Sequence, residues 1–476
     1  MNTAYPLADQ EQMVYFRKQR TGAYQPENRS PMITFNKKER IAVIGAGMSG
    51  LSCGHLLEKH GIRNFMVFEA APHIGGLARS FKWHGFDCDL APHRLFSKDQ
   101  VVLEELKALT PMVTAKRSSK IFIKGKVIND PVDPFELCLK FNPIITSRLV
   151  FGYLFKKKRP ETTFENLALN AFGKGLYEFF FRPYTEKLLG ATPEEISIEW
   201  GRQKIRVSGL SDVFRRNSKI FFRGFYYPER GGYGAIVDAM HAGIADRTLT
   251  SSPVVGVDMH DGRIKAVRYK QDGVEHTYEC DRVISTIPTT ILGKMLGIEF
   301  NLRYQPVKLV FILVDKDRVA PYHWIYFGDQ DVVINRMAEF KNFSDIDAPK
   351  GKTVLCAEVT CPTEDPVKDV LKAIEMYGLV SPAEVKDTML IVEKFGYPVY
   401  MKGFEEQKQR IQNMLREIPN LHLVGRNAEF RHIDVDEDYE SARKLVKELA
   451  AAVGDRHAGD PIPDTASRTT SEVLGS

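Results

Sequence analysis

Three glycines near the start of the chain have the spacing of a nucleotide-binding turn. Gly45, Gly47 and Gly50 follow a short apolar run, residues 41–44, that predicts a buried strand. In such a turn the first glycine allows the bend, the second lets the backbone approach a pyrophosphate, and the third brings strand and helix together. The helix predicted over residues 51–60 would offer unpaired N–H groups and a partial positive charge to the phosphates.

An acidic residue follows at the distance that this chemistry requires. Glu69 ends the next predicted strand, residues 65–68, and lies nineteen residues after Gly50. A carboxylate at that place can accept hydrogen bonds from the hydroxyls of an adenosine ribose. An ordinary strand–turn–helix unit would explain the glycines alone. Strand, glycines, helix, second strand and acid together favour a dinucleotide site.

Several later motifs indicate which dinucleotide is bound. Residues 71–80 contain a second glycine pair, Gly75 and Gly76, followed by Arg79, for which a nicotinamide dehydrogenase has no obvious use. Further motifs lie at residues 86–96, 184–190, 227–232, 397–400 and 423–427. With them, residues 40–453 resemble the flavin amine oxidase and protoporphyrinogen oxidase superfamily, in particular the branch of UDP-galactopyranose mutase and its bacterial oxidoreductase relatives. A nicotinamide dehydrogenase or a non-catalytic nucleotide-binding protein is the less favoured class.

The resemblance implies FAD as the cofactor and identifies the residues that would contact it. No cysteine lies near residues 425–436, where some relatives attach the flavin covalently, so we expect non-covalent FAD. The main chain at Val254 matches the position that reaches adenine in relatives, and Asp436 precedes the last predicted helix. The expected cofactor contacts are Gly45, Gly47, Met48, Ser49, Gly50, Glu69, Gly76, Leu77, Arg79, His93, Val254, Gly425, Arg426 and Asp436.

Four residues are candidates for catalysis or substrate binding. His93 matches a motif histidine beside the flavin, although Ser97 stands where the mutase usually has a second histidine. His93 can serve flavin contact or acid–base work, and a satisfied loop histidine is the alternative. By resemblance, Arg206 matches an arginine for a substrate diphosphate, with Arg202 and Arg336 as weaker candidates and a solvated arginine as the alternative.

Two tyrosines complete the set of four candidate residues. The motif at residues 184–190 is expected to have a structural role. Tyr397 and Tyr400 carry hydroxyls that can reach phosphate or sugar, and the alternative is that both tyrosines serve only in packing. In the motif at residues 184–190 we expect Glu186 and Lys187 to pair and fix a helix end.

Composition excludes several classes of function. The net charge of +5 is small beside 127 charged residues, and no nucleic-acid-binding motif occurs. Six scattered cysteines without C-x-x-C spacing predict reduced thiols in a cytoplasmic protein, with no metal site. A small-molecule substrate is expected, and the sequence does not determine the oligomeric state.

One stretch has the pattern of a membrane-surface segment. The apolar residues 149–155 are followed by the basic residues 156–159. A helix end with lysines near its C-terminal dipole is the favoured explanation, and peripheral contact with an anionic membrane is the alternative.

The 476 residues are too many for one core and predict an α/β fold with two interleaved domains. A discontinuous Rossmann-like FAD-binding domain would comprise residues 39–98, 231–288 and 421–453. An inserted α+β substrate domain would comprise residues 99–230 and 289–420. Residues 1–38 and 454–476 are expected to be flexible tails.

Two functions follow from the resemblance. The first is an FAD-dependent oxidoreductase that transfers a hydride from an organic substrate to flavin N5. The alternative is a redox-neutral mutase that acts on a nucleotide sugar through reduced FAD.

Overall fold

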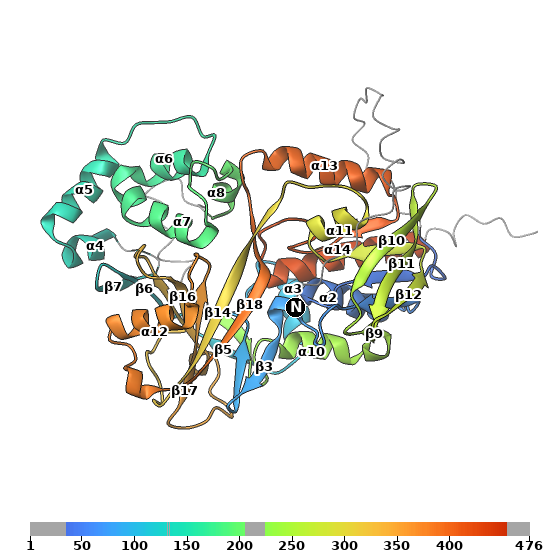
Figure 1. The fold of residues 1–476 in the computed structure, drawn as a ribbon, viewed down its shortest axis with the longest axis horizontal. Coiled ribbons are helices and arrows are strands. Elements are labelled where there is room, and N and C mark those ends of the chain that lie inside the picture. The colour runs from blue at the N-terminus through green and yellow to red at the C-terminus, as the bar shows by residue number, and fades with distance from the viewer. Residues whose placement is uncertain (1–34, 131, 133, 205–223, 455–476) are drawn as a thin grey trace, which may run out of the picture.

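The computed structural model describes residues 35–130, 132, 134–204 and 224–454. Figure 1 shows an elongated molecule with a group of helices at one end and a small antiparallel sheet at the other. A larger sheet, with two long strands, lies between them.

A five-stranded parallel sheet holds the strand that leads into the glycine turn. The strand Ile41–Ile44 is its central strand and is fully buried, as expected for a parallel strand covered on both faces. The order is β19 (Leu421–Leu423), β13 (Arg282–Ser285), β1 (Ile41–Ile44), β2 (Phe65–Phe68) and β9 (Thr248–Leu249). The predicted α/β fold class is therefore confirmed.

Three helices pack together beside this sheet. Helix α2 (Met48–Lys59) follows β1 and contacts both α10 (Ala235–Ala242) and α14 (Val435–Gly454). Buried leucines of α2, such as Leu51 and Leu57, join a core that includes Val446 and Leu449 of α14. The start of α2 is thereby held beside the start of the last helix.

A three-stranded antiparallel sheet is joined to this end of the molecule. It consists of β10 (Val254–His260), β11 (Arg263–Gln271) and β12 (Val274–Glu279). Both turns are Asp-Gly pairs with positive φ, Asp261 at 50° and Asp272 at 50°, as tight hairpins require. Residues 248–260 are divided between two sheets, because β9 pairs with β2 and β10 pairs with β11.

A seven-stranded mixed sheet forms the middle of the molecule. Its long strands β14 and β18 run antiparallel, with Arg303 opposite Val399. The order is β18 (Val385–Val399), β14 (Arg303–Val314), β17 (Thr353–Val359), β16 (Ile334–Glu339), β15 (Trp324–Phe327), β6 (Ser119–Ile123) and β7 (Lys126–Asn129).

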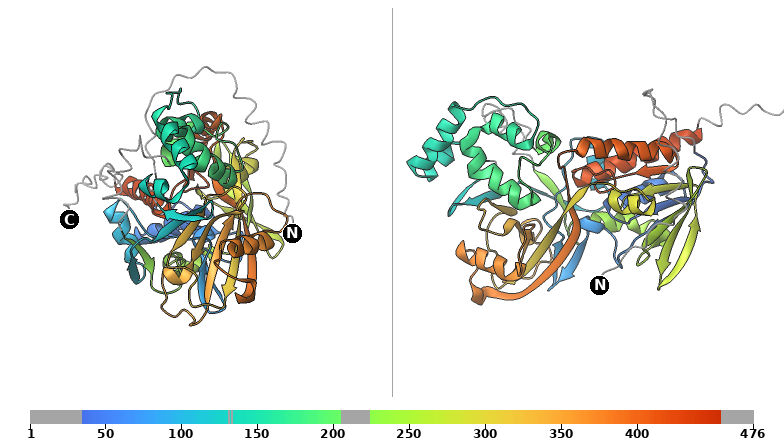
Figure 2. Two further views of the ribbon diagram at one scale, coloured as in Figure 1. Left: turned by 90° about the vertical axis from the view of Figure 1, so that its left-hand side faces the viewer. Right: turned by 45° about the horizontal axis from the view of Figure 1, so that its top comes forward.

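A group of five helices lies over one end of this sheet (Figures 1 and 2). The helices are α4 (Pro134–Lys140), α5 (Pro143–Leu154), α6 (Phe164–Leu176), α7 (Arg182–Leu189) and α8 (Ile198–Lys204), with one π-turn at Tyr177–Phe181. Helices α5 and α6 touch backbone to backbone. A Cβ added at Gly152 would lie 2.4 Å from the nitrogen of Gly175.

The remaining elements connect these layers. Strands β3 and β4 form a hairpin, and β5 pairs with β8. Their bounds are β3 (Ser80–Trp83), β4 (Phe86–Asp89), α3 (Gln100–Lys107), β5 (Met112–Ala115), β8 (Phe225–Pro228), α11 (Thr289–Met295), α12 (Pro366–Met376) and α13 (Phe404–Glu417).

The parallel sheet draws its strands from residues 41–68, 248–285 and 421–423, whereas the mixed sheet draws its strands from residues 119–129 and 303–399. The domain boundaries at 99, 231, 289 and 421 stay predictions. Most of the two predicted tails, residues 1–34 and 455–476, lies outside the described residues. Within the described ranges, no helix has the length and apolar composition needed to cross a bilayer.

Candidate functional site

One cavity of about 1120 Å³ extends from the glycine turn to the group of helices. Its volume exceeds the ~300–1,000 Å³ of an ordinary ligand pocket, which leaves room for a cofactor and a substrate together. At one end it is lined by Gly45, Gly47, Met48, Ser49, Glu69, Gly76, Leu77, His93, Arg426 and Asp436.

Two positions of the glycine turn, Gly45 and Gly50, do not tolerate a side chain, and the position between them, Gly47, faces open space. Gly45 has φ of 101°, and a Cβ at Gly50 would lie 1.9 Å from the carbonyl oxygen of Gly45. A Cβ at Gly47 would approach nothing closer than Gly76 Cα at 3.9 Å, in the cavity that both glycines line. Helix α2 begins directly after Gly47 with no side-chain cap. Its first N–H groups therefore fit a pyrophosphate.

Main-chain N–H groups hold the acidic residue in place. Glu69 Oε2 accepts a hydrogen bond from the N–H of Ala46 at 2.7 Å, and Oε1 accepts one from the N–H of Ala71 at 2.9 Å. The carboxylate also lines the cavity, and each oxygen retains a lone pair for a ribose hydroxyl. This arrangement fits an adenine dinucleotide.

Four of the predicted cofactor contacts, Gly50, Arg79, Val254 and Gly425, lie outside the cavity lining. Arg79 forms an ion pair with Glu393 of β18 at 3.1 Å and also donates to the carbonyl of Gly76. Val254 is a buried residue at the start of β10, and Gly50 is covered by the turn itself.

The turn after β19 joins the start of α14 to the start of α2. Gly425 has φ of 93°, and a Cβ there would lie 1.9 Å from Ser49 Oγ, so Gly425 itself is part of the junction. Asp438 Oδ1 accepts hydrogen bonds from Ser49 Oγ at 2.9 Å and from the N–H of Arg426 at 2.8 Å. Burial raises the pKa of the Asp438 carboxyl to about 6.

A second acid of α14 faces the cavity directly. Burial raises the pKa of Asp436 to about 6, although a hydrogen bond with Ser97 opposes that shift. Ser97 stands where the mutase motif usually has its second histidine. In this chain the residue contacts the helix start and does not line the cavity.

His93 lies in the cavity as a neutral imidazole. Burial, together with the positive charges of Arg336 and Arg426, lowers its pKa to about 4. Its Nδ1 has no hydrogen-bond partner among the described residues. A buried nitrogen without a partner is normally satisfied by a ligand or water, so His93 fits a residue that contacts a bound molecule.

Arg426 is fixed by three neighbours of the same cavity wall. Its Nη2 donates to the carbonyl of Gly396 at 3.0 Å and lies 3.2 Å from His432 Nδ1. The guanidinium also lies 5.1 Å from the centre of the Tyr397 ring, within range of a cation–π contact. Its buried Nε has no partner among the described residues.

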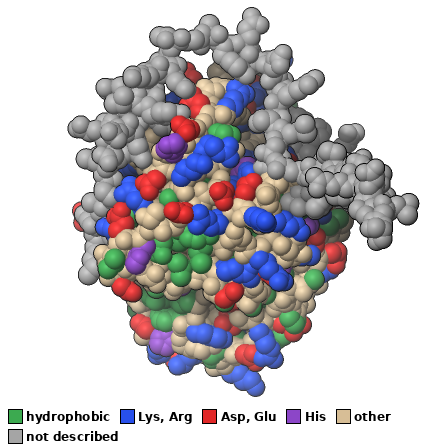
Figure 3. Space-filling view, turned by 90° about the vertical axis from the view of Figure 1, so that its right-hand side faces the viewer, with side chains coloured by type: hydrophobic (Ala, Val, Ile, Leu, Met, Phe, Trp, Pro, Cys, Tyr) green, Lys and Arg blue, Asp and Glu red, His purple; other side chains and the backbone are tan. Residues whose placement is uncertain are grey.

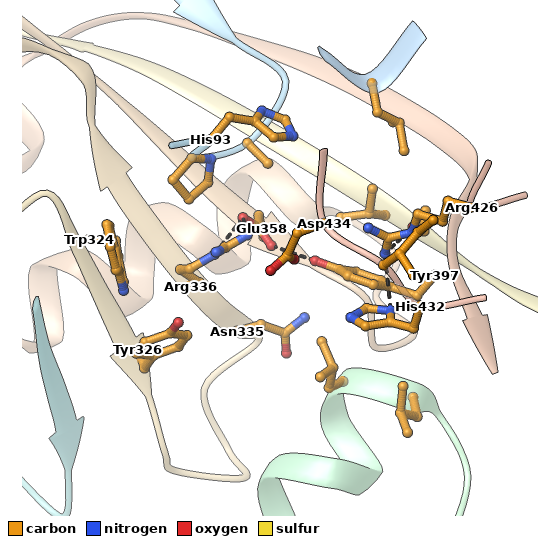
Figure 4. A pocket seen from close by; sticks show the side chains of 18 of the residues that line it. His93, Trp324, Tyr326, Asn335, Arg336, Glu358, Tyr397, Arg426, His432 and Asp434 are labelled. Carbon is orange, nitrogen blue, oxygen red and sulfur yellow. Dashed lines mark hydrogen bonds and ion pairs between the residues drawn. The ribbon is translucent and has the colours of Figure 1, made fainter. Parts of the chain in front are cut away.

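Next to Arg426, and sharing Tyr397 with it, the mixed sheet contributes an ionic network (Figure 4). Arg336 Nη2 lies 2.6 Å from Glu358 Oε1, and Tyr397 donates to Glu358 Oε2 at 3.1 Å. Burial lowers the pKa of the Arg336 guanidinium, but Glu358, Tyr397 and Tyr326 together outweigh burial and leave that pKa raised. These residues come from β16, β17 and β18 and all line the cavity.

The other predicted catalytic residues are placed differently. The buried Tyr400 does not line the cavity; its hydroxyl accepts a hydrogen bond from the N–H of His432 at 2.8 Å and so holds the segment after Arg426. Arg206 lies outside the described residues. Arg202 is an exposed arginine that pairs with Glu199 on α8.

Several cavity residues carry no signal that the sequence reasoning used. Arg94 lines the cavity near Trp324, whose ring centre lies 5.8 Å from its guanidinium carbon. Among the described residues, no carboxylate forms an ion pair with Arg94, whereas Arg117 pairs with Asp130. Arg94 directly follows His93 in the predicted motif, and that position could have identified it. Other unpredicted polar or aromatic residues of the lining include Trp324, Tyr326, Asn335, Glu358, His432 and Asp434.

The far wall of the cavity is apolar. Its residues come from α4 to α7 and the π-turn and include Leu137, Leu149, Phe164, Phe172, Phe180 and Phe181. The cavity thus joins a polar end at the glycine turn to an apolar end under the helices.

Comparison with known proteins gives a match over most of the chain. A family model described as flavin containing amine oxidoreductase matches residues 48–450. The dTDP-fucopyranose mutase of Escherichia coli is 20% identical over 410 residues, covering 83% of this chain and 94% of that protein. Protoporphyrinogen oxidase 2 of Arabidopsis thaliana is 27% identical over 178 residues, so the match spans only 34% of either protein.

Two solved structures share the fold. A reduced UDP-galactopyranose mutase superposes with a TM-score of 0.75 at 21% identity, covering 87% of this chain and 94% of that one. A putative protoporphyrinogen oxidase from Exiguobacterium sp. 255-15 superposes with a TM-score of 0.67 at 17% identity, covering 87% and 99%.

Proposed function

The chain belongs to the flavin-containing amine oxidoreductase family and its cofactor is FAD; from this premise we propose that it is an oxidoreductase for a substrate with a largely apolar body. Bound FAD supplies a hydride acceptor at ring atom N5 and passes the electrons on to an external acceptor. The substrate loses a C–H hydrogen as hydride and, from the adjacent heteroatom or carbon, a proton.

The observation that carries this proposal is the apolar half of the cavity. Leucine and phenylalanine side chains of the helical group form the wall opposite the glycine turn. Apolar walls bind substrates through burial of apolar surface, at about 25 cal/mol per Å². A nucleotide sugar has little apolar surface to bury there.

The residues at the polar end would hold the cofactor without a covalent bond. The N-terminus of α2 and the carboxylate of Glu69 fit the pyrophosphate and the ribose, as their contacts indicate. The N-terminus of α14, beside Arg426, would favour the negative charge that a flavin ring gains on reduction.

His93 and Tyr397 are the residues that we propose to touch the reacting atoms. The imidazole of His93 is neutral at pH 7 because its pKa is about 4, so its Nδ1 can accept a hydrogen bond from a bound molecule. Tyr397 presents its ring beside Arg426 and its hydroxyl to Glu358. Tyr400 acts as a positioning residue through His432.

We also propose an anionic group on the substrate. Arg94 lines the cavity without a carboxylate partner among the described residues, and its pKa is lowered by burial and, to a smaller extent, by the positive charge of Arg117. A guanidinium in such a place favours a carboxylate or phosphate.

A redox-neutral mutase is the second candidate. It is favoured by the match along 94% of the length of the dTDP-fucopyranose mutase and by the buried Arg336, which could serve a phosphate or sugar. The reaction would then need reduced FAD and no external acceptor.

Anaerobic spectroscopy of the purified holoenzyme separates the two candidates. The oxidoreductase predicts that an apolar amine, dihydro-polyene or reduced tetrapyrrole bleaches the flavin band and that oxygen restores it. The mutase predicts no bleaching by these compounds and conversion of a nucleotide sugar by dithionite-reduced enzyme alone. The second result would overturn the proposal.

A further inference from the structure

The helices α4 and α5 expose an apolar surface that the fold does not cover. Of the large hydrophobic side chains that are exposed in the described residues, six lie on these helices or directly after α5. They are Leu139 (86% exposed), Ile144 (66%), Val150 (42%), Phe151 (57%), Leu154 (65%) and Phe155 (75%). We name this set the α5 surface. It lies at the left-hand end of the molecule in Figure 1.

The α5 surface cannot be covered by a rotation of α5 onto its neighbour. Gly152 and Gly173 bring α5 and α6 into backbone contact, since a Cβ at Gly173 would lie 2.2 Å from the carbonyl oxygen of Gly152. The opposite side of α5 therefore faces outward. None of the described residues of α5 is buried. That is unusual for a helix of such apolar composition.

The charges around this surface have one sign. Between Glu136 and Glu161 the sequence contains no acidic residue and six basic ones, Lys140, Arg148, Lys156, Lys157, Lys158 and Arg159. That excess is larger than the net charge of +5 of the whole chain. At the opposite end of the molecule, acidic and basic side chains are interspersed (Figure 3).

Lysines at a helix end explain only part of this pattern. Helix α5 ends at Leu154, so the basic run follows its C-terminus and complements the dipole. The dipole gives no reason for exposed phenylalanines beside the lysines. An apolar surface rimmed by basic residues complements the interior and the headgroups of an anionic bilayer.

The same helix is also a wall of the cavity. Leu149, Val150, Tyr153 and Leu154 line the cavity, and two of these, Val150 and Leu154, are also exposed to solvent. The cavity therefore reaches the protein surface along α5, at the α5 surface.

We propose that the α5 surface docks on an anionic phospholipid bilayer and that the substrate enters the cavity from that bilayer. The docking is interfacial, with α5 lying on the membrane and Lys157 and Lys158 at the headgroups. The source of the substrate rests on the proposed function, whereas the docking itself does not, because it requires no flavin chemistry.

Vesicle co-sedimentation of the full-length holoenzyme tests the docking. We expect binding to phosphatidylcholine vesicles that contain phosphatidylglycerol, and at least about tenfold weaker binding to phosphatidylcholine alone, because each lysine near the surface contributes electrostatic attraction. Lys157→Ser with Lys158→Ser should lose at least about tenfold in affinity for the anionic vesicles. The matched control, Lys265→Ser with Lys270→Ser, removes two exposed lysines of β11 at the other end and should bind as the parent does.

A tryptophan placed on the surface gives an independent readout. Phe155→Trp should show a blue shift and an increase of fluorescence on addition of anionic vesicles, and Val274→Trp, exposed on β12, should show neither. No binding by the parent protein, or equal binding by both lysine variants, would overturn the proposal. Vesicle binding without any flavin bleaching by apolar substrates would instead leave the docking intact and contradict the proposed oxidoreductase.

Discussion

At the scale of single residues, the site depends on buried charges whose partners come from distant segments. Glu358, Arg336 and Tyr397 stand on three strands of the mixed sheet, and Asp438 contacts residues of two different turns. Such groups contribute to function only when their partners stay in place, because a buried charge without its partner costs several kcal/mol. Two substitutions test this dependence.

The Arg336–Glu358 pair should be much more costly to break than an exposed pair. Arg336→Met leaves the Glu358 carboxylate buried with only Tyr397 as a side-chain donor, and we expect a loss of about 3–5 kcal/mol in the free energy of unfolding. Arg336→Met combined with Glu358→Leu should recover much of that loss. Arg202→Met, which breaks an exposed pair with Glu199, should cost at most about 1 kcal/mol. Urea unfolding measures all three, and equal losses in both pairs would contradict the expectation.

Asp438 should make the protein less stable as the pH rises from about 4 to about 6. Its pKa is raised from 3.8 to about 6 in the folded state, so over that range the unfolded chain releases its proton first and folding becomes less favourable. Asp438→Asn keeps an oxygen for both Ser49 and Arg426 and removes the charge. The variant should be ~1–3 kcal/mol more stable than the parent at pH 7 and equal to it near pH 4.

The control for this experiment is Asp272→Asn, in an exposed turn where asparagine also tolerates positive φ. Urea unfolding across the pH range should show the parent slope in this control and a shallower slope in Asp438→Asn. If the free energy of unfolding changed equally with pH in Asp438→Asn and Asp272→Asn, ionisation of Asp438 would not destabilise the folded protein.

At the scale of elements, glycines and one lysine hold the strands and helices at the distances that the site needs. The contact between β1 and α2 is closer than any side chain permits at residue 50. The contact between α7 and the loop after β15 depends on Lys187, whose Nζ donates to four main-chain carbonyls, those of Phe327, Asp329, Val332 and Ile334. The expected Glu186–Lys187 pair is wrong, because Glu186 pairs with Arg182 instead.

Gly50→Ala should abolish FAD binding. The added Cβ would lie 1.9 Å from the carbonyl oxygen of Gly45, so the turn must open and its N–H groups lose their placement. Gly243→Ala is the matched control because a Cβ there meets nothing within 4 Å and its φ of −81° suits alanine. Flavin absorbance per protein in the purified variants gives the answer, and full FAD occupancy in Gly50→Ala would contradict the role of the turn.

Lys187→Met should destabilise the fold and disturb the substrate wall. Four carbonyl oxygens at 2.6–3.1 Å lose a charged donor, and a hydrogen bond to a charged group is worth ~1.5–3 kcal/mol, so we expect a loss of at least about 2 kcal/mol. Lys174→Met on α6, whose side chain is 71% exposed, should change stability by less than ~0.5 kcal/mol. Chemical denaturation compares the two, and similar losses would show that the buried ammonium is not special.

At the scale of the whole molecule, the cavity is built from segments that are far apart in the chain. Gly45, Glu69, His93, Arg336, Tyr397 and Asp436 all line it, and they come from the parallel sheet, the mixed sheet and their connections. A ligand that contacts all of them binds the folded state alone. FAD should therefore act as a stabiliser of the entire fold.

The apoprotein should have a lower melting temperature than the holoprotein. Added FAD should raise that temperature by an amount that grows with the free FAD concentration. At a free FAD concentration of about 1,000 times Kd, linkage gives roughly 4 kcal/mol of added stability. Calorimetry of the apoprotein titrated with FAD measures this effect, and riboflavin, which lacks the pyrophosphate and adenosine, should give a much smaller shift. Equal shifts with riboflavin and FAD would contradict binding along the glycine turn.

The sequence by itself determined the parts of the site that are local. Gly45, Gly47, Gly50 and Glu69 lie within one strand–helix–strand unit, where backbone sterics and the strand period fix their positions without help from the rest of the chain. The same reasoning placed the last helix after Asp436, and the resemblance supplied the family and FAD.

Only the tertiary structure decided which side chains meet across the cavity. Arg336 and Glu358 are 22 residues apart and become partners because β16 and β17 are adjacent in the mixed sheet, a pairing that strand patterns do not reveal. Arg79 and Tyr400, read from the motifs as site residues, lie outside the cavity lining and instead contact two residues that line it, Glu393 and His432. Local patterns specify what a residue can do; packing between distant segments specifies what it faces, because burial and charge depend on every element that surrounds it.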